Sequence, residues 1–309
     1  MSKELSWPKV VVIGAGAVGG YFGGMLARAG APVTMIGRQV FVEAVKNSGL
    51  QLNTVQFRET VYPEASTEIA AAAGAEVILL CVKTTDTAST AKNLAPHISP
   101  GAIVVSLQNG VNNAEELRTA AGIDPLPAVV YVAAAMSPPG YVKHLGRGDL
   151  VVGPRNARTE RIANLFQQAE VPCRISENIV GELWTKLIWN CALNAISTLG
   201  NVTYGEIFAS SDARRIIETL VKEVLAVAGA KGIHLPGLGD PKAALAGALK
   251  IAEQMSGTRS STAQDMARRK RTEIDSLNGY VARLGEQLGV ATPVNHALYT
   301  LVKLQESRF

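Results

Sequence analysis

Residues 9–20 read KVVVIGAGAVGG. The apolar run Lys9–Ile13 predicts a buried strand, and Gly14–Ala29 predicts a helix that opens on glycine. In a G-x-G-x-x-G loop with this setting, the first glycine permits a tight turn, the second lets a pyrophosphate approach, and the third allows close helix–sheet packing. We therefore predict a dinucleotide-binding loop, with a glycine-rich turn that binds nothing as the alternative. Its residues are Gly14, Ala15, Gly16, Ala17, Val18 and Gly19.

Short apolar runs continue along the first half of the chain, at intervals that leave room for crossover helices. Strands that alternate with helices are typical of a parallel sheet covered on both faces. Further on, Gly146-Arg147-Gly148 is predicted to be the turn of a hairpin between Tyr141–Leu145 and Asp149–Gly153. The other predicted strands are Pro32–Ile36, Glu76–Val82, Ala102–Ser106 and Ala128–Ala133.

The pattern changes near residue 178, after which only helices are predicted. We therefore expect an α/β protein, with an N-terminal Rossmann-type dinucleotide-binding domain over residues 1–177 and an all-helical C-terminal domain over residues 178–309. The predicted helices are Val180–Leu199, Asp212–Lys231, Lys242–Met255, Thr262–Leu288 and Pro293–Glu306.

Composition excludes several classes of protein. With 47% hydrophobic residues and a net charge of +4 over 309 residues, the chain is neither disordered nor charged enough to indicate nucleic-acid binding. Its three cysteines form no CxxC, so neither a disulfide framework nor a metal site is indicated. The uncharged stretch Val10–Ala27 holds too many glycines for a membrane span or a signal peptide. A cytoplasmic protein that binds no membrane is expected.

The end of the second strand indicates which dinucleotide is bound. About twenty residues after the glycine loop, NAD-binding proteins carry an acidic residue that holds the ribose hydroxyls. This chain reads Ile36-Gly37-Arg38-Gln39 there. Arg38 could pair with a 2′-phosphate, which an acid would repel, so NADP(H) is favoured over NAD(H). The alternative is that Arg38 is an ordinary surface charge.

A polar stripe runs along the first long helix of the second half. Lys186, Asn190 and Asn194 recur every four residues in an otherwise apolar segment, so they share one face. Burying an ammonium and two amides is costly unless they meet polar groups. Those groups could belong to a substrate or to another segment of a helical bundle, and the spacing alone does not choose between them.

Several motifs together resemble the ketopantoate reductase family, in the 6-phosphogluconate-dehydrogenase-like superfamily, from Val10 to about Pro293. The glycine loop is generic, whereas K-L-x-x-N-x-x-x-N followed by S-x-x-x-D and T-E-I-D-x-x-N-G is specific. The motifs are GAGAVGG at 14–20, CVKTTDT at 81–87, LQNG at 107–110, KLIWNCALN at 186–194 and SSTAQDMARRKRTEIDSLNG at 260–279.

The resemblance implies an enzyme that reduces 2-dehydropantoate to (R)-pantoate with NADPH, in pantothenate and coenzyme A biosynthesis. It implies that Lys186 is the general acid and that Glu273 is the acidic residue beside it. Asn190, Asn194 and Ser261 match residues that bind the substrate. Because Ser261 and Glu273 are twelve residues apart, a continuous helix would separate them by about 18 Å. Either a loop intervenes and the chain turns, or Glu273 acts through Lys186 and not on the substrate. We favour a loop over residues 255–261, with Ser260 or Ser261 as the N-cap of the next helix.

The resemblance also implies the cofactor contacts. Arg38 matches the basic residue that binds the NADPH phosphate, and Lys83 and Asn109 match residues that line the nicotinamide and substrate cleft. Asn109 is thus expected to contact both ligands, and Glu273 is expected to contact the cofactor as well. The expected partner is a small 2-keto acid, with no nucleic acid and no membrane, and a homodimer is left open.

Other functions are compatible with these residues. A β-hydroxyacid dehydrogenase of the same superfamily also places a lysine and an asparagine on a helix, and a paralogous reductase could act on another 2-keto acid. A protein of a different class, a non-catalytic NADP(H) sensor, would need the glycine loop but not Lys186.

Overall fold

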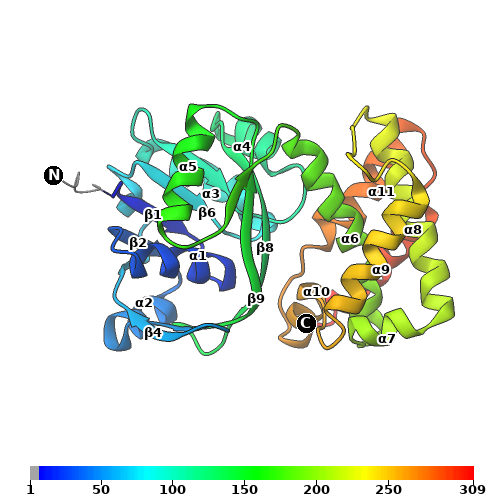
Figure 1. Ribbon diagram of the computed structural model, residues 1–309, viewed down its shortest axis with the longest axis horizontal. Coiled ribbons are helices and arrows are strands. Elements are labelled where there is room, and N and C mark those ends of the chain that lie inside the picture. Colours follow the sequence, from blue (N-terminus) through cyan, green and yellow to red (C-terminus); the bar gives the residue numbers. More distant parts are fainter. Residues whose placement is uncertain (1–6) are drawn as a thin grey trace. The chain divides into compact units, whose positions relative to one another are not determined.

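The computed structural model describes residues 7–309, which form two compact units that divide between Ile179 and Val180. The first unit is a sheet with helices on its faces, and the second contains only helices over residues 180–309 (Figure 1). The mixed α/β class with a helical C-terminal region, predicted from the sequence, is confirmed.

The sheet of the first unit has ten strands in the order β4-β3-β9-β8-β7-β6-β1-β2-β5, with β10 paired to β9. Strands β5, β2, β1, β6 and β7 are parallel, whereas β8 and β9 form a long antiparallel pair. The strands are β1 (Val10–Ile13), β2 (Val33–Ile36), β3 (Leu50–Asn53), β4 (Arg58–Val61), β5 (Glu64–Ser66), β6 (Val77–Leu80), β7 (Ile103–Ser106), β8 (Leu126–Met136), β9 (Tyr141–Val152) and β10 (Cys173–Ile175).

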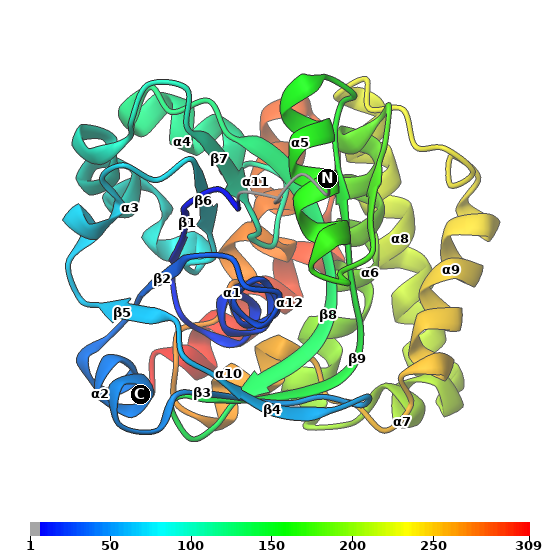
Figure 2. The same cartoon turned by 60° about the vertical axis from the view of Figure 1, so that its left-hand side comes forward.

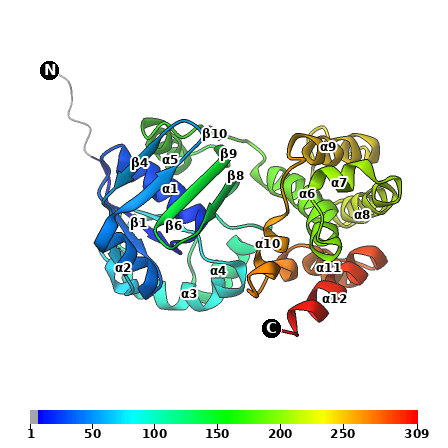
Figure 3. The ribbon, with the colours of Figure 1, turned by 90° about the horizontal axis from the view of Figure 1, so that it is seen from below.

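Helices cover both faces of the parallel strands (Figure 3). Because side chains alternate along a strand, Val10 and Val12 of β1 pack toward α1 and α5, while Val11 and Ile13 pack toward α3 and α4. This two-sided burial explains why the central strands are continuous apolar runs. The helices of this unit are α1 (Ala17–Arg28), α2 (Gln39–Ser48), α3 (Thr87–Leu94), α4 (Asn113–Ala121) and α5 (Ala157–Gln168).

The sheet curls around α1, which contacts β1 and β2 as well as β3, β8 and β9 (Figure 2). Glycines on α1 make this enclosure sterically feasible. A Cβ added at Gly20 would lie 2.5 Å from Met136 Cε, and one added at Gly24 would lie 2.7 Å from a methyl carbon of Leu52. The long glycine-rich helix thus serves packing well beyond the G-x-G-x-x-G loop.

The predicted hairpin turn at Gly146-Arg147-Gly148 is wrong, because β9 runs unbroken through it. Pairing with β8 shifts register twice opposite this segment, so the glycines lie at irregularities within a strand. Arg147 adopts a φ of 57° there. Its side chain lies over the Tyr131 ring at 4.0 Å and pairs with Asp149. Strands β3, β4, β5 and β10 were not predicted either.

The second unit also departs from expectation, because α7 (Tyr204–Ala209) is not predicted and one predicted helix is divided. The helix predicted over Thr262–Leu288 is interrupted after Ala267, where Arg269 adopts a φ of 52° and a short 3-10 helix, η4 (Ile274–Ser276), follows. Among the described helices, none has both the length and the apolar character needed to cross a membrane. The helices are α6 (Ile179–Gly200), α7 (Tyr204–Ala209), α8 (Ser211–Ala230), α9 (Pro241–Gln254), α10 (Ser261–Ala267), α11 (Asn278–Leu288) and α12 (Pro293–Glu306).

Candidate functional site

The glycine loop lies where the sheet reverses its strand order. The chain passes from β1 to β2 on one side and later reaches β6 on the other, so the loop after β1 marks a switch point. The last residues of β1, β6 and β7 are paired in register. Gly14, Lys83 and Asn109 follow these three strands, and the fold therefore brings their segments to one edge of the sheet.

The three glycines of the loop have different steric surroundings. Gly14 has a φ of +98°, and a Cβ there would lie 2.5 Å from the Val82 nitrogen. A Cβ at Gly19 would overlap the Gly14 carbonyl oxygen. Gly16 is exposed, and apart from its neighbours in the chain a Cβ added there would meet no atom of the described residues within 4 Å. The fold itself therefore requires Gly14 and Gly19, whereas Gly16 keeps open the space that a pyrophosphate would enter.

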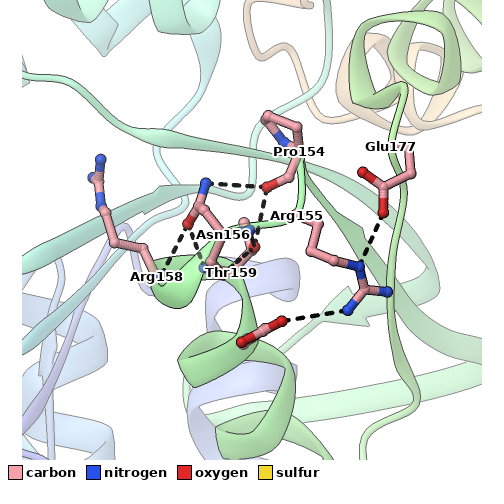
Figure 4. Close-up of polar contacts among 7 residues, drawn as sticks. Pro154, Arg155, Asn156, Arg158, Thr159 and Glu177 are labelled. Carbon is pink, nitrogen blue, oxygen red and sulfur yellow. Dashed lines mark hydrogen bonds and ion pairs between the residues drawn. The ribbon is translucent and has the colours of Figure 1, made fainter.

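The N-terminus of α1 also fits an anion. Within residues 7–309, no side chain caps this helix end, and its first turn carries no acidic residue. Helix α5 shows the contrast (Figure 4): Asn156 Oδ1 accepts hydrogen bonds from the backbone of Arg158 and Thr159, at 2.9 and 3.0 Å. Uncapped N–H groups and the positive end of the helix dipole favour a phosphate at α1.

Arg38 lies just after β2, in the segment beside the glycine loop. The Ile36 carbonyl oxygen accepts hydrogen bonds from the backbone nitrogens of Gly14 and Ala15, at 3.0 and 3.2 Å, which fixes the end of β2 to the loop. A Cβ at Gly37 would lie 2.9 Å from the Ala15 Cβ, so glycine permits this approach. Arg38 then follows as the exposed N-cap residue of α2. Its position beside the loop suits a contact with the adenosine side of a dinucleotide.

A buried glutamine, Gln108, helps to hold the segments that follow β6 and β7 at the carboxyl ends of the strands. Gln108 donates a hydrogen bond from Nε2 to the backbone oxygen of Val82, next to Lys83, at 3.1 Å. Asn113 donates from Nδ2 to the backbone oxygen of Asn109 at 2.6 Å. The LQNG motif predicts a role for Asn109 but none for Gln108, because the hydrogen bond of Gln108 depends on a residue 26 positions away.

In the second unit, α6 is continuous over the polar stripe, so Lys186, Asn190 and Asn194 do share a helix face. Lys186 and Asn190 are partly buried, and Asn194 is 3% exposed. Ser260 donates a hydrogen bond from Oγ to the Asn194 backbone oxygen at 3.2 Å. Ser261 follows directly as the first residue of α10, and it is exposed.

The segment from Ser260 to Glu273 turns back toward α6. The expected serine N-cap is confirmed, since Ser260 Oγ accepts a hydrogen bond from the Ala263 nitrogen at 3.0 Å. Because α10 ends at Ala267, the 18 Å spacing of a continuous helix does not separate Ser261 from Glu273. Glu273 precedes Ile274, which packs in one apolar cluster with Ala195 of α6. Both segments are thus anchored to the helix that carries the stripe.

A buried polar network supports α6 near the two asparagines of the stripe. Asn278 donates from Nδ2 to the Cys191 backbone oxygen at 3.1 Å and to Asn295 Oδ1 at 2.9 Å. The Glu223 carboxylate accepts hydrogen bonds from the backbone nitrogens of Val294 and Asn295, each at 2.9 Å, and so caps α12. Asn278 lies in the motif at 260–279, but the sequence alone does not predict this structural role.

The described residues contain no group of three or more His, Cys, Asp or Glu side chains placed to hold a metal ion. Cys81, Cys173 and Cys191 are free thiols. Burial raises the pKa of the Cys173 thiol to about 12, and it also raises the pKa values of the other two thiols. All three are therefore protonated at neutral pH and unsuited to nucleophilic chemistry.

Both units of the chain match a known protein family. The family described as ketopantoate reductase PanE/ApbA matches residues 10–157, and its C-terminal counterpart matches residues 178–306. The 2-dehydropantoate 2-reductase of Pyrococcus horikoshii is 33% identical over 303 residues, covering 97% of this chain and 98% of the relative.

Solved structures agree with the sequence comparison. The PanE/ApbA family ketopantoate reductase from Ralstonia eutropha JMP134 is 46% identical with a TM-score of 0.91, covering 97% of this chain and 99% of that one. D-mandelate dehydrogenase with NADH and anilino(oxo)acetate is 25% identical with a TM-score of 0.90, covering 97% and 98%. The sequence matches account for both units, and the chain belongs to the ketopantoate reductase family.

Proposed function

We propose that this protein reduces 2-dehydropantoate to (R)-pantoate with NADPH. The observation that carries the proposal is the α6 stripe, on which Lys186 lies in line with two amide side chains. Full-length relatives called 2-dehydropantoate 2-reductase, at 30–33% identity for three of them, support the reaction. In this proposal residues 1–177 bind the cofactor and residues 178–309 bind the keto acid. We also propose that the protein is cytoplasmic and that it forms a homodimer.

The first unit would hold NADP(H). The open space at Gly16 and the uncapped start of α1 suit the pyrophosphate, and Arg38 would pair with the 2′-phosphate. When bound, NADPH supplies the hydride that adds to the ketone carbon. The residues proposed to contact it are Gly14, Ala15, Gly16, Ala17, Val18, Gly19, Arg38, Lys83, Asn109 and Glu273.

Lys186 would act on the ketone oxygen. Negative charge develops there as the carbonyl is reduced, and an ammonium group both stabilises that charge and donates the proton that completes the alcohol. Glu273 would pair with the ammonium and keep it charged until transfer. Asn190, Asn194 and Ser261 would donate hydrogen bonds to the substrate's other oxygen atoms, and Asn109 would assist from the first unit's loop.

Lys186→Ala tests this role. Loss of a positioned general acid typically costs 10²–10⁴-fold, so turnover should fall by about that factor. NADPH affinity, followed by cofactor fluorescence, should stay unchanged, because the proposed phosphate contacts are in the first unit. Lys186→Gln retains a hydrogen-bond donor but no titratable proton, so its pH profile separates orientation from proton donation. Turnover above about a tenth of wild type in Lys186→Ala would exclude the general-acid role.

A second candidate is reduction of another 2-keto acid. The similarity to D-mandelate dehydrogenase, whose structure contains NADH, favours it as the alternative to be tested. Initial rates with 2-dehydropantoate and with phenylglyoxylate, each with NADPH and NADH, separate the two functions. The proposal expects the highest kcat/KM for the pair of NADPH and 2-dehydropantoate, and a preference for phenylglyoxylate would replace it with the second candidate.

A further inference from the structure

Tyr204 makes a buried hydrogen bond to the polar stripe. Its side chain is 8% exposed, and its hydroxyl donates to Asn194 Oδ1 at 3.0 Å. The backbone of Tyr204 is fixed at the start of α7, where Thr203 and Glu206 form a capping box. The Tyr204 nitrogen also donates to the Thr258 backbone oxygen at 2.9 Å. The hydroxyl is therefore held in place independently of any ligand.

This contact determines which end of the Asn194 amide is available. The two ends of a side-chain amide point in different directions, one accepting hydrogen bonds and the other donating them. Because Oδ1 accepts the hydrogen bond from Tyr204, the amide is held with Nδ2 directed away from the tyrosine. A flipped amide would leave the buried phenol proton without this acceptor, which is costly. Burial also raises the pKa of the Tyr204 phenol, so that it remains a donor at neutral pH.

We propose that Tyr204 is a positioning residue that orients the Asn194 amide so that Nδ2 donates to an oxygen of the bound 2-keto acid. The inference rests on the proposed function and deepens it. The carboxylate and ketone oxygens of such a substrate only accept hydrogen bonds, so an amide oxygen presented in place of Nδ2 would repel them. Tyr204 thus makes the site selective for ligands rich in acceptors.

The test compares Tyr204→Phe with a matched control. Tyr299→Phe also removes a phenol from the second unit, but that hydroxyl donates to Asp275 Oδ1 at 2.9 Å. Tyr204→Phe should raise KM for the keto acid by about two- to twelve-fold, the range for one hydrogen bond, with a smaller change in kcat and none in NADPH affinity. Tyr299→Phe should leave KM unchanged. An unchanged KM in Tyr204→Phe overturns the proposal.

A double-mutant cycle separates positioning from a general loss of stability. In an Asn194→Ala background, Tyr204→Phe should raise KM no further, because the amide that it orients is gone. A further rise equal to that in the wild-type background would show that Tyr204 acts by another route and would overturn the proposal. Melting temperatures of all variants show whether each one is folded at the assay temperature.

A readout without turnover distinguishes failure of this inference from failure of the proposed function. The Asn194 side-chain amide gives a proton–nitrogen resonance pair that is absent from Asn194→Ala. In the apoprotein this pair should shift in Tyr204→Phe and not in Tyr299→Phe. If the wild type reduces no 2-dehydropantoate, the proposed function fails, and KM is compared for whichever 2-keto acid it does reduce. An unmoved resonance pair contradicts the hydrogen bond itself.

Discussion

Gly16→Ala should separate cofactor binding from folding. At Gly16 the backbone has φ −86° and ψ −158°, which alanine adopts without strain. Apart from its neighbours in the chain, the added methyl group would meet no described protein atom within 4 Å. It would instead occupy the space in front of α1 where a pyrophosphate is expected. The variant is therefore predicted to fold normally and to bind NADPH poorly.

The expected magnitudes follow from the two environments of the methyl group. In the free protein, a strain-free glycine-to-alanine change stabilises by about 0.4–1 kcal/mol through the unfolded chain, so the melting temperature should stay level or rise slightly. In the complex, an extra methyl group in a close-packed contact costs about 1–3 kcal/mol, which corresponds to a roughly 5- to 150-fold weaker Kd.

Gly19→Ala is the matched comparison within the same loop. Its Cβ would overlap the Gly14 carbonyl oxygen and lie 2.9 Å from Val12 Cγ1, so this variant should lose stability. Thermal melting and titration of NADPH fluorescence measure both quantities for the two variants. A Gly16→Ala variant that binds NADPH as tightly as wild type, or whose melting temperature falls as far as that of Gly19→Ala, would refute a pyrophosphate site beside Gly16.

Two further predictions concern charged side chains. Arg38→Ala should raise the KM for NADPH by about 10- to 150-fold, the loss of a charge-assisted contact of 1.5–3 kcal/mol, while kinetics with NADH stay nearly constant; equal effects on both cofactors would contradict the assignment. Burial raises the pKa of Asp275, but hydrogen bonds from Lys303 and Tyr299 outweigh it and hold that pKa below its ordinary value. Its ionised form therefore stabilises the fold above about pH 4, and this contribution is lost as the pH falls through the lowered pKa. Asp275→Asn should thus lower the melting temperature at pH 7, with a gap from wild type that closes in acid; a gap independent of pH would refute this.

Local signals in the sequence predicted the central strands and the glycine loop. Residues 9–20 specify a strand, a turn and a helix start within one short segment, and α12 has the bounds predicted from its proline and its periodicity. The stripe on α6 was also predictable, because helix spacing alone places Lys186, Asn190 and Asn194 on one face.

The features that could not be predicted from the sequence depend on contacts between residues far apart in the chain. The glycines at 146 and 148 are typical of a turn, but a long paired strand, β8, keeps β9 extended through them. Gln108 and Tyr204 are ordinary polar residues until the fold brings Val82 and Asn194 beside them. These roles depend on hydrogen bonds between residues that are distant in the sequence. In β9, tertiary contacts also override the intrinsic propensity of the glycines to form a turn.

The order of strands in the sheet has a consequence for synthesis on the ribosome. Strand β3 carries two almost fully buried leucines, yet one of its edges pairs with β9, where Gln51 is opposite Tyr141. At typical translation rates of 5–20 residues per second, the ninety intervening residues take about 5–20 s to emerge. During that interval the nascent β3–β4 hairpin exposes its apolar face and an unpaired edge. The β3 edge can therefore gain its β9 partner only after residues 141–143 have left the exit tunnel.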